Sequence, residues 1–190
     1  MKIPEHAKLV FKWKMFDTYQ WEQEMFDWSI KIFEKLKKNN TIDIVAVSED
    51  WYIYILEEEQ PWRPPFYGLV WWTCEEWEDT IDTAKRELLE ETGFISNDWI
   101  LFKSYSKSSK IDYESVIYIA RNCKKIQEQN LDSGEKITIK KVNWKEFLDI
   151  VADPKFRVQE FALDTLRYIY LWKEEELKNI ILTDKTGMAK

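Results

Sequence analysis

Three glutamates in one short segment, Glu87, Glu90 and Glu91, are spaced in a way that suits chemistry. Offsets of three and four residues place them on one face of a helix, where their negative charges repel one another. A divalent cation bound between them would remove that repulsion, and oxygen ligands of this kind suit Mg²⁺ or Mn²⁺. The alternative is a solvated acidic face, which is what most glutamate-rich helices carry.

The segment around these glutamates has the pattern of an amphipathic helix. Ala84 and Leu88 supply its apolar side, and Asp79 or Thr80 caps its start. Gly93 fits the left-handed position just beyond its end. We therefore expect the three carboxylates to be held on a helix whose two ends are fixed by the sequence itself.

The stretch RELLEETGF, residues 86–94, resembles the second half of the Nudix box, whose pattern is G-x5-E-x7-R-E-U-x-E-E-x-G-U with U aliphatic or aromatic. Glu78 stands eight residues before Arg86, where the family has its earlier glutamate. The resemblance implies a loop–helix–loop that holds a divalent metal against a diphosphate. It also implies hydrolysis of a nucleoside diphosphate linked to another moiety, in a domain that spans residues 40–182.

The same resemblance implies a role for each polar residue of the box. Glu87, Glu90 and Glu91 match the metal-binding glutamates, and Glu90 and Glu91 are also candidate catalytic residues. Glu78 supports the loop or reaches the metal through water. Arg86 ties the helix to the loop.

The first half of the box departs from the family pattern. Trp72 stands at the leading glycine, Trp71 at a position that is commonly glycine or alanine, and Trp77 where the loop often has glycine again. If these sites need a positive φ, each tryptophan costs about 1–2 kcal/mol. Because the chain has 11 Trp and only 4 Gly, we hypothesise that tryptophan replaces glycine here and also at Trp51 and Trp62. The alternative is that the tryptophans form an apolar or base-stacking wall.

Three further features resemble the ADP-ribose pyrophosphatase-like branch of the family. One is the strand-rich segment before residue 40. The second is EEEQPWRPP, in which Arg63 is placed to meet a phosphate or ribose; the alternative for Arg63 is a surface salt bridge. The third is the loop LDSGEK, where Glu135 matches a mobile catalytic carboxylate, Asp132 is its nearest substitute, and the alternative is an ordinary loop charge.

These observations lead to two functions that differ in class. The first is hydrolysis of the diphosphate bond of ADP-ribose or a related nucleoside diphosphate sugar, with Mg²⁺ or Mn²⁺ as cofactor. The second is a catalytically impaired Nudix module that binds a nucleotide or a partner, because Trp71, Trp72 and Trp77 occupy glycine-type positions.

Bulk properties limit the partners of this 190-residue chain. A formal charge of −7 argues against a nucleic-acid-binding face. No apolar run is long enough to span a membrane, and the start lacks the apolar core of a signal sequence, so a cytoplasmic location is expected. Cys74 and Cys123 stand far apart and predict neither a disulfide framework nor a zinc site.

The order of strands and helices predicts an α+β fold, in which helices flank a mixed sheet. Residues 1–39 alternate apolar and polar side chains, which predicts an antiparallel β extension that mediates a homodimer. Residues 60–68 are expected to be irregular because they contain three prolines. Residues 157–182 are expected to form one long helix, followed by a tail at 183–190.

Overall fold

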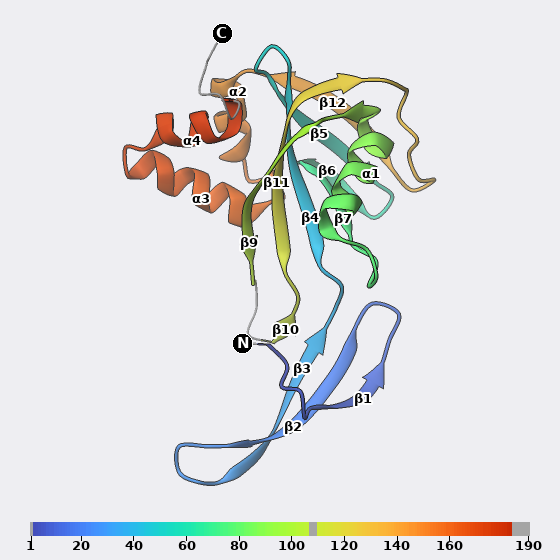
Figure 1. The fold of residues 1–190 in the computed structure, drawn as a ribbon, viewed down its shortest axis with the longest axis vertical. Coiled ribbons are helices and arrows are strands. Elements are labelled where there is room, and N and C mark those ends of the chain that lie inside the picture. The colour runs from blue at the N-terminus through green and yellow to red at the C-terminus, as the bar shows by residue number, and fades with distance from the viewer. Residues whose placement is uncertain (1, 107–109, 184–190) are drawn as a thin grey trace.

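The chain folds into two β-sheets with helices on both faces of the larger sheet (Figure 1). This computed structural model describes residues 2–106 and 110–183, which form four α-helices and twelve β-strands. The α+β fold expected from the sequence is confirmed. Within the described part of the chain, every helix is too short or too polar to cross a membrane.

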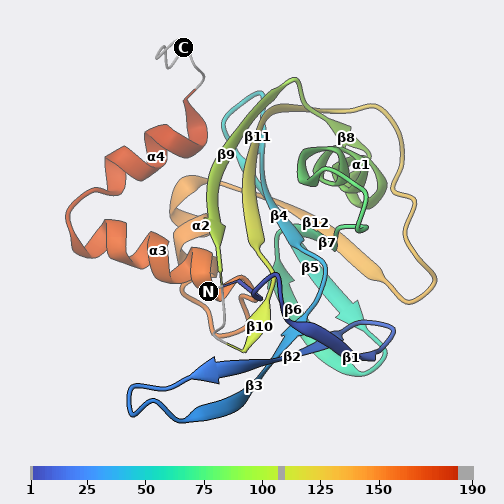
Figure 2. The same ribbon diagram turned by 60° about the horizontal axis from the view of Figure 1, so that its bottom comes forward.

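The smaller sheet extends away from the rest of the molecule, at the bottom of Figures 1 and 2. Its strands, in the order β1-β2-β3-β10, are β1 (Lys8–Lys12), β2 (Asp17–Glu24), β3 (Ile30–Lys37) and β10 (Ile111–Asp112). The first three form the antiparallel meander that the alternating sequence predicts, and β10 adds to β3 in parallel. This parallel addition has no signal in the sequence, since it joins segments about 75 residues apart in the chain.

The larger sheet has the order β12-β5-β4-β11-β8, with β6 beside β5, β7 beside β4 and β9 beside β11. Its strands are β4 (Thr41–Ser48), β5 (Ile53–Gln60), β6 (Arg63–Gly68), β7 (Val70–Thr73), β8 (Phe94–Ile95), β9 (Asp98–Tyr105), β11 (Ser115–Lys125) and β12 (Lys136–Val142). The central strands β4 and β11 are parallel to each other, whereas the other pairs are antiparallel. All eight residues of β4 are buried, as expected of a strand covered on both faces.

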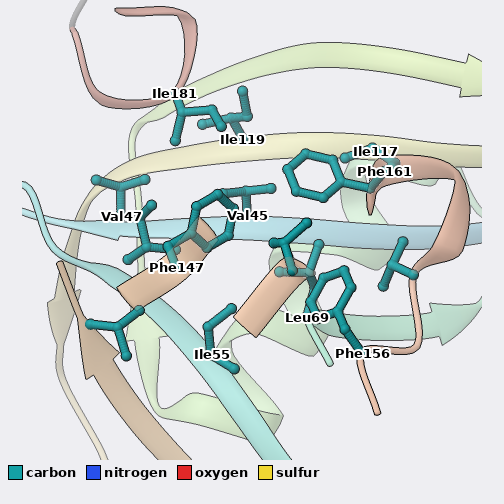
Figure 3. Close-up of a cluster of buried hydrophobic side chains, with 14 of the residues drawn as sticks. Val45, Val47, Ile55, Leu69, Ile117, Ile119, Phe147, Phe156, Phe161 and Ile181 are labelled. Atoms are coloured by element: carbon teal, nitrogen blue, oxygen red, sulfur yellow. The ribbon is translucent and has the colours of Figure 1, made fainter. Parts of the chain in front are cut away.

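Each face of the larger sheet packs against its own set of helices. One face meets α2 (Trp144–Val151), α3 (Gln159–Tyr170) and α4 (Glu174–Leu182), and Figure 3 shows part of this core around Val45, Phe147 and Phe161. The other face meets α1 (Thr80–Thr92) through residues that include Leu56 and Leu88. Because side chains alternate along a strand, β4 and β5 contribute to both cores.

Local signals set the ends of α1. The Asp79 carboxylate accepts a hydrogen bond from the Ile81 amide at 3.4 Å, and the Gly93 amide donates to the Leu89 carbonyl at 2.8 Å. Gly93 has a φ of 73°, and a Cβ added there would lie 2.0 Å from the Gln127 carbonyl oxygen. Glycine is therefore required at the end of the helix that carries the glutamates.

Two expectations about the chain were wrong. Residues 63–68 form strand β6, because Pro64 and Pro65 lie at an irregularity in its pairing with β5, where no amide is needed. The long C-terminal helix is two helices, since the chain turns at Trp172, where the Lys173 amide donates to the Tyr168 carbonyl at 2.8 Å.

The tryptophans of the box do not adopt the backbone conformation that the glycine pattern suggested. Trp71 and Trp72 lie in β7, paired with Asp43 and Ile42. Neither they nor Trp77 have a positive φ, and the backbone penalty expected at these three positions is therefore absent.

Positive φ occurs at other tryptophans. Trp51 has a φ of 66°, as hypothesised, whereas Trp62 has no positive φ. Trp28 and Trp172, which the sequence did not single out, have φ values of 65° and 59°. Tryptophan thus occupies left-handed positions in turns and at a helix end, but not in the box.

Candidate active site

Two of the box glutamates are buried and one is partly exposed. Glu87 and Glu91 retain 2% and 3% of their accessible surface, because the offset of four residues turns both towards the sheet. The side chain of Glu90 is 40% exposed. A solvated acidic face is therefore the wrong interpretation for Glu87 and Glu91.

Arg86 links all three carboxylates that lie near it. Its Nε and Nη2 atoms donate to the two oxygens of Glu78 at 3.2 and 3.1 Å, and its Nη1 atom donates to Glu90 at 3.1 Å and contacts Glu87. The hydrogen bonds from Arg86 lower the pKa of Glu78. Arg86 therefore joins α1 to the loop that precedes it, through a two-point pairing that only a guanidinium makes.

A further buried carboxylate, Glu58, comes from β5 and was missed in the sequence. It keeps 3% of its surface, and its Oε2 atom accepts a hydrogen bond from the indole of Trp71 at 3.4 Å. A Cβ on Gly68, in the neighbouring strand, would lie 2.6 Å from Glu58 Oε1, so glycine leaves the room that this carboxylate fills. The signal was present: Glu58 follows Leu56 by two residues, and Leu56 packs in the core that contains α1.

Three oxygens of the buried carboxylates lack a hydrogen-bond donor in the described part of the chain. Glu58 Oε1 and both carboxylate oxygens of Glu91 are buried and accept no hydrogen bond from any described residue. Burial raises the pKa of Glu58 and Glu87 to about 7, and it raises the pKa of Glu91 well above its ordinary value. The charge of Glu58 raises the pKa of Glu91 further. Of the three buried glutamates, Glu91 is thus the one whose two oxygens both lack a donor among the described residues.

The loop carboxylate Glu135 lies close enough to act on this cluster. Its negative charge raises the pKa values of Glu58, Glu87 and Glu91, while desolvation raises its own. Glu135 is partly buried in the loop between β11 and β12, and its carboxylate accepts a hydrogen bond from the Asp132 amide at 3.3 Å. The structure therefore brings the loop glutamate and the box glutamates together.

Two arginines lie beside the carboxylates. Arg63 is exposed, and its Cζ atom is 5.0 Å from the centre of the Phe66 ring. Arg157, which the sequence did not single out, has its Cζ atom 3.4 Å from the centre of the Trp71 ring and its Nη1 atom 4.0 Å from Glu58 Oε2. Burial lowers the pKa of Arg157.

Trp71 contacts both Glu58 and Arg157. Its ring covers the Arg157 guanidinium while its indole donates to Glu58. Trp72 lies beside it, with ring centres 6.3 Å apart, and the side chain of Trp77 is exposed. A cavity of about 430 Å³ opens next to the box loop, beside Glu75 and Glu76, rather than over the buried carboxylates.

The residues present fit a hard divalent cation. Among the residues that the structure describes, no three potential ligands are already arranged around a metal position. The unpartnered oxygens of Glu91 and Glu58 nevertheless supply oxygen donors without competing hydrogen bonds, which is the donor chemistry that Mg²⁺ and Mn²⁺ prefer. Glu87 would become a further ligand if the metal ion replaced Arg86 as the partner of its carboxylate.

The pKa values predict how stability depends on pH without metal. Glu58 and Glu87 bind protons up to about pH 7 in the folded chain, but only up to about pH 4.5 in the unfolded chain. The folded state therefore holds more protons in this window, and the free energy of unfolding decreases as pH rises from 5 to 7. The slope is at most about 1.4 kcal/mol per pH unit for each group.

Denaturant unfolding in EDTA at pH 5, 6 and 7 measures this slope. Glu91→Gln removes one buried acid and should flatten it, whereas Glu175→Gln, on exposed α4, should not. Adding Mn²⁺ at pH 7 should restore stability to the parent chain. An unfolding free energy that rises from pH 5 to 7, with the same slope in Glu91→Gln, would show that these carboxylates are not strained by burial.

Comparison with known proteins identifies solved structures that share this fold. No family model matches the sequence, and no curated protein matches it. A solved structure described as an ADP compounds hydrolase superimposes with a TM-score of 0.70 at 19% identity, covering 90% of this chain and 94% of that one. A NUDIX hydrolase from Nitrosomonas europaea superimposes with a TM-score of 0.55 at 19% identity, covering 71% of this chain and 90% of that one. The chain therefore shares the fold of these two solved hydrolases, one of which is described as a NUDIX hydrolase.

Proposed function

We propose that this protein is a divalent-metal-dependent hydrolase that cleaves the diphosphate bond of ADP-ribose or a related nucleoside diphosphate sugar. The observation that carries the proposal is the buried cluster of Glu58, Glu87 and Glu91, in which Glu58 and Glu91 have oxygens without donors among the described residues, on a Nudix fold. The similarity to a protein described as an ADP compounds hydrolase supports this substrate class.

The reaction needs a water molecule to attack one phosphorus while the bridging P–O bond breaks. When bound, Mg²⁺ or Mn²⁺ would neutralise the diphosphate and lower the pKa of the attacking water. A carboxylate takes the proton of that water, and the electron pair of the broken bond leaves on the departing phosphate. Glu135 is our candidate for the base, because it borders the cluster from a loop. Glu90 is the alternative, since its side chain is exposed beside the buried glutamates.

Arg86 contributes to this reaction by holding other residues in place. Its two hydrogen bonds to Glu78 fix the loop before α1, and its contacts with Glu87 and Glu90 hold two carboxylates on the side of the helix where metal would bind. Glu78 thereby supports the loop. The carboxylates keep their geometry before substrate arrives, which lowers the reorganisation that catalysis requires.

The second candidate is an impaired Nudix module that binds a nucleotide or a partner. The observation that favours it is the position of Trp71, whose indole donates to Glu58 and covers Arg157. A side chain at that point excludes a ligand from the same space. The two candidates differ in turnover, not in fold.

Activity measurements on carboxylate variants test the hydrolase. In Mg²⁺ or Mn²⁺, Glu91→Gln, Glu90→Gln and Glu135→Gln should each lower kcat on ADP-ribose by about 10²–10⁴-fold, the usual loss for a missing acid–base group or ligand. Phosphate release is measured across ADP-ribose, other nucleotide sugars and nucleoside triphosphates. Glu175→Gln, a matched change on an exposed helix, should retain parental kcat.

The outcomes separate the candidates. Full turnover in EDTA would refute metal dependence, and near-parental kcat in Glu135→Gln would assign the base to a box glutamate. Absence of turnover in the parent chain, followed by its appearance when Trp71, Trp72 and Trp77 are all replaced by glycine, would identify the impaired module. Absence of turnover in both proteins would contradict the hydrolase.

We further propose a homodimer formed through the N-terminal extension, residues 1–39, with residues 40–182 as the Nudix domain. The extension leaves Leu9, Phe11, Ile30 and Ile32 exposed on its small sheet. Such apolar surface is typical of an interface, and a second copy would cover it. The same proposal assigns the protein to the cytoplasm, where the unpaired thiols of Cys74 and Cys123 would remain reduced.

Light scattering at micromolar concentration measures the assembly. The parent chain should have twice the mass of one chain, and a change of Ile30 and Ile32 together to lysine should halve it, because charges on the exposed face oppose association. Substitution of lysine at exposed Leu163, on α3, is the control and should leave the mass unchanged. A monomeric parent would contradict the proposal.

A further inference from the structure

Arg157 is held against the site by main-chain hydrogen bonds. The Arg157 amide donates to the Tyr67 carbonyl at 2.9 Å, and the Tyr67 amide donates to the Lys155 carbonyl at 3.0 Å. These bonds attach the segment between α2 and α3 to β6, the strand that neighbours Glu58. The backbone position of Arg157 is therefore set by pairing with β6.

The guanidinium of Arg157 has a hydrogen-bond donor that no described residue accepts. Its Nη1 atom is buried and donates to no acceptor among the described residues, while Glu58 Oε2 lies 4.0 Å away, too far for a hydrogen bond. A guanidinium carries five N–H donors in a planar fork that matches the oxygens of carboxylate or phosphate. Leaving such donors buried without an acceptor is costly, and a ligand oxygen would relieve that cost.

A second cation converges on the same ring. Arg63 and Arg157 have their Cζ atoms 5.0 and 5.5 Å from the centre of the Phe66 ring. Two positive groups around one aromatic side chain repel each other. An anion with several oxygens, placed between or beside the two guanidiniums, would neutralise both charges and accept their hydrogen bonds. A diphosphate is such an anion.

We propose that Arg157 is a substrate-binding residue that, together with Arg63, binds the diphosphate beside the metal-binding glutamates, and that Trp71 covers this subsite. The proposal rests on the proposed function and extends it to the part of the site that positions the anion. Carboxylates on one side and guanidiniums on the other would hold a metal–diphosphate complex by both of its charges.

Trp71 takes the place of that ligand. Its indole N–H meets Glu58 and its ring lies on the Arg157 guanidinium, so one side chain covers a metal-side group and an anion-side group at once. Glycine at this position would remove the cover and leave both groups open. The affinity for diphosphate should therefore increase in Trp71→Gly.

Equilibrium binding of inorganic pyrophosphate, measured by calorimetry with Mg²⁺, tests the subsite apart from hydrolysis. Trp71→Gly should bind at least tenfold more tightly than the parent. In the Trp71→Gly background, Arg157→Gln should lose at least tenfold in affinity, and Arg157→Lys should fall between, since it keeps the charge and loses the fork. Arg167→Gln, which removes an equal charge from exposed α3, should have no effect.

The outcomes separate this inference from the proposed function. Equal affinity in Arg157→Gln and Arg167→Gln would overturn the subsite even if the protein hydrolyses ADP-ribose. Loss of pyrophosphate binding in Arg157→Gln without any turnover would support the subsite and contradict the hydrolase. If Arg157→Gln does not fold, Arg157→Lys decides, and parental affinity there would overturn the subsite. Absence of binding in both the parent and Trp71→Gly would overturn it as well.

The tryptophans with positive φ carry a second, independent inference. Within the described residues, four that are not glycine have positive φ: Trp28, Trp51, Asn122 and Trp172. Asparagine tolerates this conformation, but tryptophan there costs about 1–2 kcal/mol. Three such tryptophans in one chain, beside only 4 Gly in all, are a pattern that packing does not explain.

Each of these tryptophans stands where glycine is usual. Trp28 lies in the β2–β3 hairpin turn and Trp51 in the β4–β5 turn. Trp172 follows α3 at the left-handed position that ends helices, and its side chain is 95% exposed. Trp28 is 82% exposed, so neither of these two side chains gains burial to offset its strained backbone.

Other tryptophans of the same chain behave normally. Trp21 is 5% exposed, and its indole donates to Gln23 at 3.1 Å. The indoles of Trp99 and Trp144 donate to the Ser96 carbonyl and to Glu174, both at 2.9 Å. The chain thus contains two kinds of tryptophan, distinguished by backbone conformation and by partners.

We infer that the cell that makes this protein incorporates glycine at positions 28, 51 and 172. A codon that one genetic code translates as tryptophan and another as glycine would produce this pattern. Peptide mass spectrometry of the protein isolated from its own cells should then find glycine at these three positions and tryptophan at Trp21, Trp99 and Trp144. Tryptophan at positions 28, 51 and 172 would overturn the inference, and the same spectra report the residue at position 71.

Discussion

The whole site depends on carboxylates that are buried away from water and lack a hydrogen-bond donor. Both oxygens of Glu91 and one of Glu58 are in this state. A buried carboxylate must either keep a proton or acquire a positive partner, because the isolated charge is too costly in a medium of low dielectric. The packing of α1 on the sheet imposes this choice, since it removes Glu87 and Glu91 from solvent.

The positive charge near these groups is unevenly distributed. Arg86 is committed to Glu78, Glu87 and Glu90, and it holds the outer side of the helix in place. Arg157 lies beside Glu58, and its buried Nη1 atom donates to no described residue. Arg86 is therefore held by internal ion pairs, whereas Glu58 and Arg157 each keep a buried polar atom without a partner in the described part of the chain. Trp71 contacts both Glu58 and Arg157, so the proposal assigns to this one residue an effect on both binding and turnover.

The sequence predicted the box helix in detail because its signals are local. Capping by Asp79, the spacing of the glutamates and the left-handed position of Gly93 depend only on neighbours in the chain. Glu58 and Arg157 reach the site through pairings between distant segments, such as that of Tyr67 with residues 155–157. Local patterns carry no information on such pairings, although alternation along β5 indicated which face Glu58 occupies.

The break in the C-terminal helix was missed for a different physical reason. A glycine at position 172 would have marked a helix end, but tryptophan is an acceptable residue inside a helix and gave no such signal. The same substitution pattern led to the expectation of strain in the box, where Trp71 and Trp72 adopt strand conformation instead. Residue type was thus misleading at both places, and backbone conformation identified which tryptophans are out of place.

The central claim is that a divalent cation replaces the proton that the buried carboxylates otherwise require. Anomalous X-ray diffraction from crystals of the parent chain grown with saturating Mn²⁺ tests it most directly. The account predicts an anomalous peak within bonding distance of a Glu91 oxygen, shared with Glu87 or Glu58. A peak confined to exposed carboxylates, or no peak near Glu91, would contradict it.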